Sequence, residues 1–262
     1  MIELLHHKDA LFFIIEVMMK SLKKWVFLSL ILLTFSSVTE ASVGPYLSFD
    51  IGGYSRRLEE TNPNFANSLK FFGTADSTRL LAKLGMDLNF LDIYATVGGS
   101  TLIIDDFDSY HGKMGLAYGG GLKLVMYESP TYEHFKLFIN PDVIYYKTND
   151  TIQTYSVSAG AFFTQNHEIS FTEYGIKVGG SAQYDLFEPY GGIALSSLSG
   201  QETAVSGQDI WRFGTADIKE RDNFGLFLGA NIYFDPSGRS SLFVETGGGD
   251  SGYFKVGIKT RF

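Results

Sequence analysis

Apolar and polar residues alternate along most of the chain between residues 44 and 262. The segment 79–89 shows this most clearly, with the apolar residues Leu80, Ala82, Leu84, Met86 and Leu88. The positions between them carry charges, a glycine or a polar amide in most cases. A period of two places successive side chains on opposite faces of a strand. The pattern therefore predicts strands with one apolar and one polar face.

The same alternation predicts ten strands. They are expected near residues 44–54, 79–89, 91–101, 114–127, 134–146, 171–184, 188–198, 223–234, 240–247 and 252–262.

The connections between these strands alternate in length. Long polar segments cover residues 55–78, 102–113, 147–170 and 199–222. Short turns are expected at 89–91, 128–133, 185–188 and 235–238, and a brief connection near 248–251 breaks the rule. Short turns at one end and long loops at the other are typical of transmembrane barrels.

The fold class indicated is all-β: a transmembrane antiparallel up-and-down β-barrel of about ten strands, with eight or twelve as alternatives. A soluble β-sandwich also alternates, but nothing makes its connections alternate in length. Aromatic residues are expected in two rows at the membrane interfaces. The short-turn row is Tyr127, Phe135, Tyr184, Phe187, Phe234 and Phe262, and the long-loop row is Tyr54, Tyr145, Phe171, Phe224 and Tyr253.

Composition agrees with many strands and turns. The 262 residues include 29 Gly, 23 Phe and 15 Tyr, and no Cys. The lack of cysteine excludes disulfides and thiolate metal sites. A net charge of -8 argues against a nucleic-acid partner.

The N-terminal residues 1–41 predict a signal peptide. Lys20, Lys23 and Lys24 precede an apolar stretch at 25–33, and small residues follow up to Ala41. The apolar stretches are shorter than the ~20 residues of a spanning helix. We expect cleavage after Ala41, a true start at Met18 or Met19, and a barrel over 42–262 exported to the bacterial outer membrane.

Two short motifs carry a resemblance to a known group. The segment 252–262 resembles the terminal strand of bacterial outer-membrane proteins, and 188–196 is similar to a Pro-Tyr-small-Gly strand of OmpA/Opa-type barrels. The resemblance implies outer-membrane lipid and lipopolysaccharide as surroundings and the barrel-assembly machinery as a partner during biogenesis. It implies an assembly signal made by Phe254, Val256, Ile258 and Phe262.

Charged residues on the opposite strand faces are expected in the barrel lumen. They are Lys83, Asp87, Lys123, Lys136, Asp142, Lys177, Glu245, Lys255 and Lys259. Opposite charges at these positions can pair and fill the interior. A ten-stranded barrel is only slightly wider than the size that side chains fill, so a large pore is not expected, whereas a narrow ion path is an alternative.

One predicted loop contains the candidate chemistry. Asp105, Asp106, Asp108 and His111 are metal-ligand types that suit a divalent cation, although a solvated acidic loop is the simpler interpretation. The group also resembles the Asp/His sets of omptin-type outer-membrane proteases, although those sets draw residues from separate loops and no second pair is matched here. For His167 and Glu168 a solvated loop is likewise the simpler interpretation. We assign no catalytic residue and expect no cofactor.

The leading hypothesis is a non-enzymatic outer-membrane barrel that presents surface loops for adhesion, partner contact or envelope integrity. A narrow porin-like channel for ions or small solutes is the first alternative. An omptin-like surface hydrolase that uses the loop acids with His111 or His167 is the second.

Overall fold

The computed structural model describes residues 43–61, 70–104, 110–129, 135–156, 161–206, 215–221, 223–249 and 252–262. The predicted signal peptide and the acids Asp105, Asp106 and Asp108 lie outside these ranges. Within them, no helix is long and apolar enough to cross a membrane.

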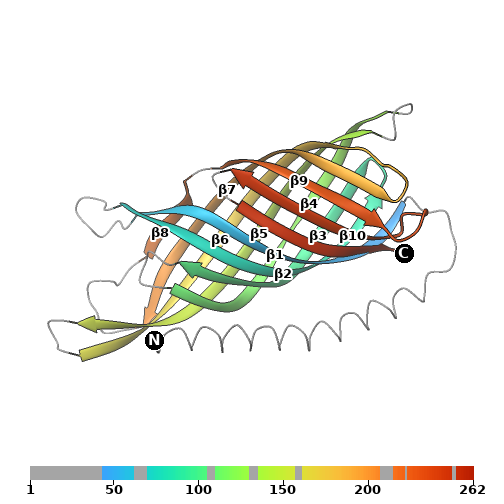
Figure 1. The fold of residues 1–262 in the computed structure, drawn as a ribbon. Coiled ribbons are helices and arrows are strands. Elements are labelled where there is room, and N and C mark those ends of the chain that lie inside the picture. Colours follow the sequence, from blue (N-terminus) through green and yellow to red (C-terminus); the bar gives the residue numbers. More distant parts are fainter. Residues whose placement is uncertain are drawn as a thin grey trace, which may run out of the picture. The chain divides into compact units, whose positions relative to one another are not determined.

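The described residues form one antiparallel sheet of eleven strands (Figure 1). The strands are β1 (Val43–Thr61), β2 (Lys70–Leu88), β3 (Leu91–Ile104), β4 (Tyr110–Glu128), β5 (Lys136–Ser156), β6 (Ala161–Ser181), β7 (Phe187–Ser206), β8 (Thr215–Glu220), β9 (Phe224–Tyr233), β10 (Ser240–Gly249) and β11 (Gly252–Arg261).

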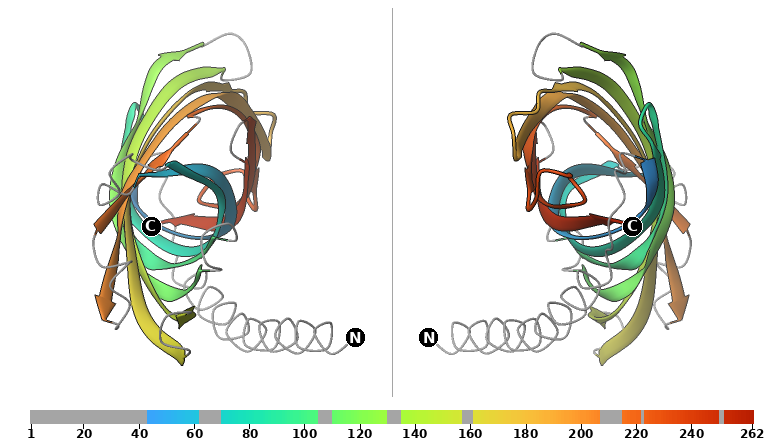
Figure 2. Two further views of the ribbon diagram at one scale, coloured as in Figure 1. Left: turned by 90° about the vertical axis from the view of Figure 1, so that its left-hand side faces the viewer. Right: turned by 90° about the vertical axis from the view of Figure 1, so that its right-hand side faces the viewer.

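The sheet closes on itself, because β11 pairs with β1 from Tyr46↔Arg261 to Ser55↔Gly252. Figure 2 shows the strands as a ring when the barrel is viewed along its length. Ten of the strands match the ten predicted from the sequence, and the predicted all-β barrel is confirmed.

The eleventh strand, β8, is the feature that the sequence pattern did not predict. It pairs with β7 from Ser199↔Lys219 to Thr203↔Thr215 and with β1 from Leu58↔Glu220 to Thr61↔Asp217. β9 continues down the same side of β7, beginning at Leu195↔Phe224. The short hairpin β10–β11 therefore stands between β9 and β1, and β8 bridges directly from β7 to β1 beyond the hairpin's tip.

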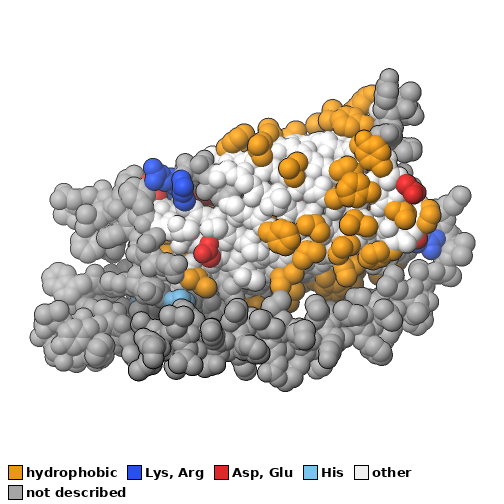
Figure 3. All heavy atoms as spheres, viewed as in Figure 1, with side chains coloured by type: hydrophobic (Ala, Val, Ile, Leu, Met, Phe, Trp, Pro, Cys, Tyr) orange, Lys and Arg blue, Asp and Glu red, His pale blue; other side chains and the backbone are white. Residues whose placement is uncertain are grey.

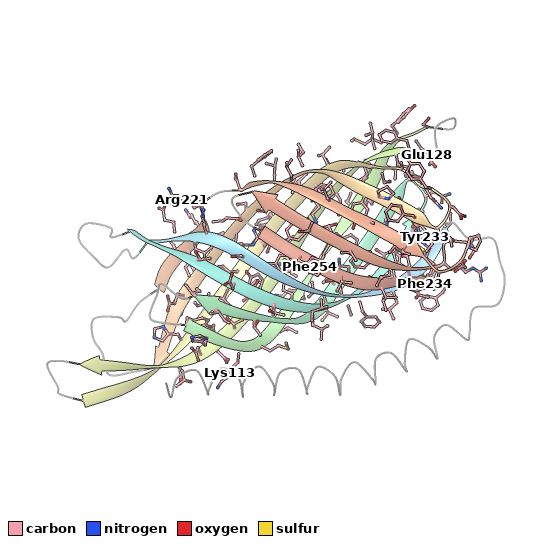
Figure 4. All side chains as sticks on the ribbon, in the orientation of Figure 1. Lys113, Glu128, Arg221, Tyr233, Phe234 and Phe254 are labelled. Carbon is pink, nitrogen blue, oxygen red and sulfur yellow. The ribbon has the colours of Figure 1, made fainter. Side chains whose placement is uncertain are left out.

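The barrel consequently has two rings of different size in the described residues. Ten strands surround the part near the short turns, which we call the turn end, and it includes Phe262. Eight strands, β1 to β8, surround the part near the long connections, which we call the loop end. Figure 4 places Lys113 and Arg221 toward the loop end, and Glu128, Tyr233 and Phe234 toward the turn end.

The strands extend further toward the loop end than predicted. β1 reaches Thr61 and β2 starts at Lys70, while β5 and β6 form a hairpin paired from Lys136↔Ser181 to Ser156↔Ala161. The expectation of long loops over 55–78, 147–170 and 199–222 was thus wrong for much of these segments. The described outward side chains of these segments, such as Arg57, Lys147 and Glu168, are polar, so the apolar outer face by which the strands were recognised stops short of them.

Tight turns connect the strands at the turn end. Asn89 and Asp185 have positive φ, at 67° and 53°, a conformation that Asn and Asp tolerate better than most residues. In the β9–β10 turn, Gly238 has a φ of 66° and its N–H donates to the Asp235 carbonyl at 3.0 Å. These residues set the strand pairing at this end.

Large apolar side chains cover the outside of the ten-stranded part (Figure 3). Leu84, Leu226 and Leu228 are each about 60% exposed or more, although they lie in regular strands. The wider apolar band includes Leu80, Met86, Ile93, Val97, Met114, Leu116, Leu122, Met126, Val143, Ile176, Val178, Ile193, Leu195, Ile232, Phe254 and Ile258. An exposed band of this size on a closed barrel is the lipid-facing surface of a transmembrane β-barrel.

Candidate functional site

The barrel interior is the candidate site, and its character changes along the strands. In β6 the outward residues Ile176 and Val178 are apolar near the middle, whereas nearer the loop end the apolar residues Ile169 and Phe171 point inward and are 1% exposed. The same switch occurs between Ile51 and Leu58 in β1, Val97 and Leu102 in β3, and Leu195 and Leu198 in β7. The apolar face therefore moves from the outside of the barrel to its inside.

Inward apolar side chains fill the eight-stranded part. This outer apolar cluster consists of Leu58, Ala75, Leu81, Leu102, Ile104, Tyr110, Ala117, Tyr146, Ile169, Phe171, Leu198 and Ile218. Every member is at most 5% exposed, and Tyr146 packs on Phe171 with ring centroids 5.4 Å apart. An eight-stranded barrel is just wide enough for side chains to fill, so the cluster closes this part of the lumen.

A buried ion cluster lies next to the outer apolar cluster. Glu173 accepts from Arg79 Nη2 at 2.6 Å and also pairs with Arg56, whose Nη1 lies 2.6 Å from Glu220 Oε1. The Arg79 guanidinium stacks between two rings, 4.2 Å from the centroid of Tyr54 and 4.6 Å from that of Tyr146. Both arginines are therefore neutralised and packed, which is the condition for burying charge.

Further ion pairs cross the lumen of the ten-stranded part. Glu245 pairs with Lys177 at 2.5 Å and with Lys255 at 3.0 Å, and Lys83 Nζ lies 3.0 Å from Asp50. At the turn end, Lys259 lies 3.1 Å from Asp92, and Asp87 accepts from Arg261 at 2.8 Å.

Two cavities remain among these side chains. A cavity of about 360 Å³ extends to the turn end, where Asn89 and Gly238 line it. A second, of about 110 Å³, lies between Asp50, Asp142 and the ion cluster of Arg56 and Arg79. Both cavities are thus lined by residues of the wider ring, and the smaller one reaches the ion cluster of Arg56 and Arg79.

Each lumen residue predicted from the sequence has a definite place. Lys83, Asp87, Lys123, Lys136, Lys177, Glu245 and Lys259 line the larger cavity, and Asp142 and Lys255 line the smaller one. Lys136 lies at the rim, where it pairs with Glu128 at 3.4 Å.

Sequence reasoning missed the ion cluster next to the outer apolar cluster. Arg56 and Glu220 belong to segments that we expected to be loops, and Arg79 stood at the first residue of a predicted strand. The signal was present, because Arg56 follows Ser48, Asp50 and Tyr54 on every second position of β1. Continuing the period of two beyond residue 54 would have placed Arg56 in the lumen.

The two histidine candidates differ in exposure. His111 is exposed, and its backbone N–H donates to Asp150 Oδ2 at 2.8 Å. His167 is 5% exposed, and its Nδ1 lies 2.6 Å from Glu202 Oε1. Among the described residues, no group of three or more His, Cys, Asp or Glu side chains is arranged to hold a metal ion.

At the loop end, outside the apolar band, Lys147 pairs with Glu168 at 2.7 Å on the outer surface of the β5–β6 hairpin. This hydrogen bond raises the pKa of Lys147. Burial raises the pKa of Tyr110, whose hydroxyl lies 2.9 Å from Thr148 Oγ1 inside the barrel. The loop end thus combines a polar exterior with a closed interior.

The first expected aromatic row is exposed as predicted, and the second is wrong for Tyr54, Phe171 and Tyr253. Tyr127, Phe135, Tyr184, Phe187, Phe234 and Phe262 are all exposed at the turn end. In the second row, Phe171 is buried in the outer apolar cluster, and Tyr54 and Tyr253 stack on each other with centroids 5.7 Å apart beside the lumen charges. These three residues stand at strand positions whose side chains point into the barrel, so they do not face the lipid.

The residues expected to form the assembly signal occupy the closing strand. Phe254, Ile258 and Phe262 are exposed on the lipid side of β11, and Val256 shares their face. Their role in assembly stays a prediction.

Comparison with known proteins gave matches among solved structures alone. No family model matches the chain, and no curated protein matches it. The chain is similar to the outer-membrane protease OmpT from Escherichia coli, with 12% identity, 85% of this chain and 99% of that chain covered, and a TM-score of 0.48.

Two further structures have similar coverage. The translocator domain of the autotransporter NalP from Neisseria meningitidis has 10% identity, 93% and 97% coverage, and a TM-score of 0.41. An outer-membrane channel from Pseudomonas putida F1 has 11% identity, 87% and 98% coverage, and a TM-score of 0.39. Similarity at this level does not assign a function to the chain.

Proposed function

We propose that this protein is a non-enzymatic, non-conducting barrel of the bacterial outer membrane that holds its loop end at the cell surface for adhesion, partner contact or envelope integrity. The observation that carries the proposal is the outer apolar cluster, which fills the eight-stranded ring. Porin-like channels have a polar, water-filled interior, whereas the side chains of this cluster are apolar and each at most 5% exposed, which supports a closed lumen.

The orientation follows from the strand connections. In transmembrane barrels the short turns face the periplasm and the longer connections face outward. The paired extensions of β1, β2, β5, β6 and β7 then project beyond the apolar band, with polar outward side chains such as Arg57, Lys147 and Glu168. Residues 62–69, 157–160 and 207–214 connect these strands in the sequence.

Conductance in planar bilayers tests the closed lumen. The purified barrel is expected to insert without steady unitary current steps. Lys177→Met, which removes a charge from the lumen, is expected to leave this baseline unchanged. Steady steps in the wild-type protein that Lys177→Met alters would contradict the proposal and support the porin-like alternative.

Replacing the outer connections tests the surface role. Cells that produce a barrel with Gly-Ser linkers at 157–160 and 207–214 are expected to lose adherence or resistance to detergent, whereas the membrane content of the barrel stays constant. The matched control replaces Ser237 in the periplasmic turn with Gly. Equal behaviour of both strains and the wild type would refute the surface role.

The hydrolase alternative stays a weaker proposal. His167 and Glu202 form a close pair that faces the inside of the barrel. His111 is exposed, and its backbone N–H donates to Asp150, the strand partner of His167. If Asp106→Ala or His111→Ala abolished a peptidase or lipase activity in a correctly folded barrel, that alternative would replace the leading one.

A further inference from the structure

We propose that a groove on the outer surface of β6, β7 and β8, which we call the outer groove, binds the phosphorylated sugar headgroup of a membrane lipid, with Lys219 contacting the phosphate. This inference goes beyond the proposed surface role, because it concerns the wall of the barrel and not its connections. Only the assignment of the lipid to the outer leaflet rests on the orientation proposed above.

The outer groove is formed by two rows of side chains that run across the three strands. Directly opposed residues of antiparallel strands share a face. The neighbours of these residues along the strands, Phe171, Leu198 and Ile218, are buried inside the barrel, so the two rows face outward. The groove has a volume of about 340 Å³. The first row is Thr172, Ser199 and Lys219, and the second is Ser170, Gln201 and Asp217.

Short side chains make the hollow. Ser170, Thr172 and Ser199 carry small hydroxyl groups, whereas the longer side chains of Gln201 and Lys219 stand beside them in the same rows. Within the described residues, no hydrogen bond engages the three hydroxyl groups, although each of them can both donate and accept. The floor of the outer groove therefore offers hydrogen-bonding groups to a ligand.

The groove lies at the level of lipid headgroups. The apolar band ends on these strands at Tyr174, Leu195 and Phe224, which are about half exposed. The groove begins one same-face step beyond Tyr174 on β6 and two steps beyond Leu195 on β7. Each step is about 7 Å along the strand, and a strand tilt of about 40° makes the height roughly 5–10 Å. The headgroup layer is about 5–8 Å thick. A lipid whose chains cover the band thus places its headgroup at the groove.

The charge beside the groove favours an anionic headgroup. Arg57, Lys219 and Arg221 are exposed there, against the carboxylates of Glu59 and Asp217. The N–H of Arg221, which Figure 4 labels, donates to the Arg57 carbonyl at 3.0 Å, so the two arginines lie on adjoining backbone. In the part of the chain that the structure describes, Lys219 forms no ion pair, although Glu59 is its strand partner. The ammonium of Lys219 is therefore available to a phosphate.

The other groups of the groove favour a sugar next to the phosphate. Asp217 accepts from Gln201 Nε2 at 3.4 Å. A phosphate placed against Asp217 would be repelled, whereas sugar hydroxyl groups donate to a carboxylate and accept from an amide or a hydroxyl. One cation and several mixed donors and acceptors in one hollow thus match a phosphorylated sugar better than a simple phospholipid headgroup.

Binding of lipid A, an acylated diglucosamine diphosphate, to the full barrel in detergent micelles tests the phosphate contact. Native mass spectrometry measures the affinity. The wild-type protein is expected to bind, and Lys219→Met is expected to weaken binding about five- to tenfold, because a charge-assisted hydrogen bond is lost. Lys113→Met is the matched control and is expected to change affinity by less than about twofold. Lys113 is exposed beside Met114 of the apolar band and does not line the groove.

A second comparison tests the sugar. Phosphatidylglycerol carries a phosphate and no sugar, so the wild-type protein is expected to bind lipid A more tightly. Ser199→Tyr fills the groove without changing its charge and is expected to remove this preference. Heat-dependent gel mobility shows whether each variant is folded. If Ser199→Tyr does not fold, Thr172→Val, which removes one hydroxyl group at nearly constant shape, must reduce the preference.

Four outcomes would overturn the site: no binding of lipid A by the wild-type protein, equal losses for Lys219→Met and Lys113→Met, equal affinities for lipid A and phosphatidylglycerol, or binding of free glucosamine 1-phosphate as tight as that of lipid A. The last result would indicate a site for a soluble sugar phosphate and not for a lipid. Because micelles have no inner and outer side, these results do not depend on the orientation of the barrel in cells.

Discussion

Individual buried charges in this barrel depend on exact partners. Arg79 is 2% exposed and touches Glu173, Tyr54 and Tyr146. Removing a buried ion from water costs several kcal/mol, which a close partner and stacked rings offset. Removal of Arg79 therefore lowers the free energy of unfolding by more than the contacts of Arg79 contributed. The reason is that Glu173 would remain buried with Arg56 as its one remaining cationic partner in the cluster.

We predict that Arg79→Met destabilises the folded barrel by about 3–5 kcal/mol. Unfolding in guanidinium, followed by tryptophan fluorescence or gel mobility, measures this change. Arg57→Met is the control, since Arg57 is exposed on the opposite face of β1, and its effect is expected to stay within about 0.5 kcal/mol. Equal free energies of unfolding for the two variants would mean that the ion cluster does not stabilise the folded barrel.

At the scale of the strand, glycine determines how closely neighbours approach. A Cβ at Gly119 in β4 would lie 2.1 Å from the Val143 carbonyl oxygen in β5, and a Cβ at Gly98 would lie 2.0 Å from the Leu80 carbonyl oxygen. These contacts involve backbone atoms, which cannot rotate away. Glycine at these two positions therefore allows β3 to approach β2 closely and β4 to approach β5 closely within the barrel wall.

Gly119→Ala is expected to lower the free energy of unfolding by about 1–3 kcal/mol, because the strands must separate to admit the methyl group. The matched variant is Gly248→Ala in β10, where an added Cβ meets nothing within 4 Å. Guanidinium unfolding of both proteins makes the comparison. A larger loss at Gly248 than at Gly119 would contradict the close-approach argument.

The whole molecule contains two kinds of barrel in sequence along its axis. The ten-stranded part is apolar outside and charged inside, as lipid around it and water within it require. The eight-stranded part is polar outside and apolar inside, as in a soluble protein. The change of face therefore marks the level at which the strands leave the membrane, and β8 makes the narrower ring possible.

This arrangement predicts a definite topology in cells. An epitope inserted between Ser156 and Ala161 is expected to bind antibody on intact cells, whereas the same epitope at Ser237 binds only after the outer membrane is permeabilised. Unboiled protein is expected to migrate differently from boiled protein on a gel, because the closed barrel resists unfolding. Labelling of the Ser237 epitope on intact cells would reverse the orientation and remove the basis of the surface role.

The sequence by itself determined the lipid-facing half of the protein. Lipid demands an apolar outer face and water in the lumen permits a polar inner face, so residues such as Leu84 and Lys83 alternate with a period of two that can be read directly. The same parity placed nine charged residues around the lumen. Local turn chemistry at Asn89 and Asp235 to Gly238 located the short connections.

Tertiary structure decided the other half and the partners of each charge. Beyond the membrane the apolar residues are few on each strand, as Ile169 and Phe171 on β6 show, and they form a core only when eight strands bring them together. The pairing of β8 with β1 joins residues 58–61 to 217–220, and no local pattern encodes contacts at such separation. The same holds for Arg56, Glu173 and Glu220, whose attraction depends on ring closure rather than on sequence spacing.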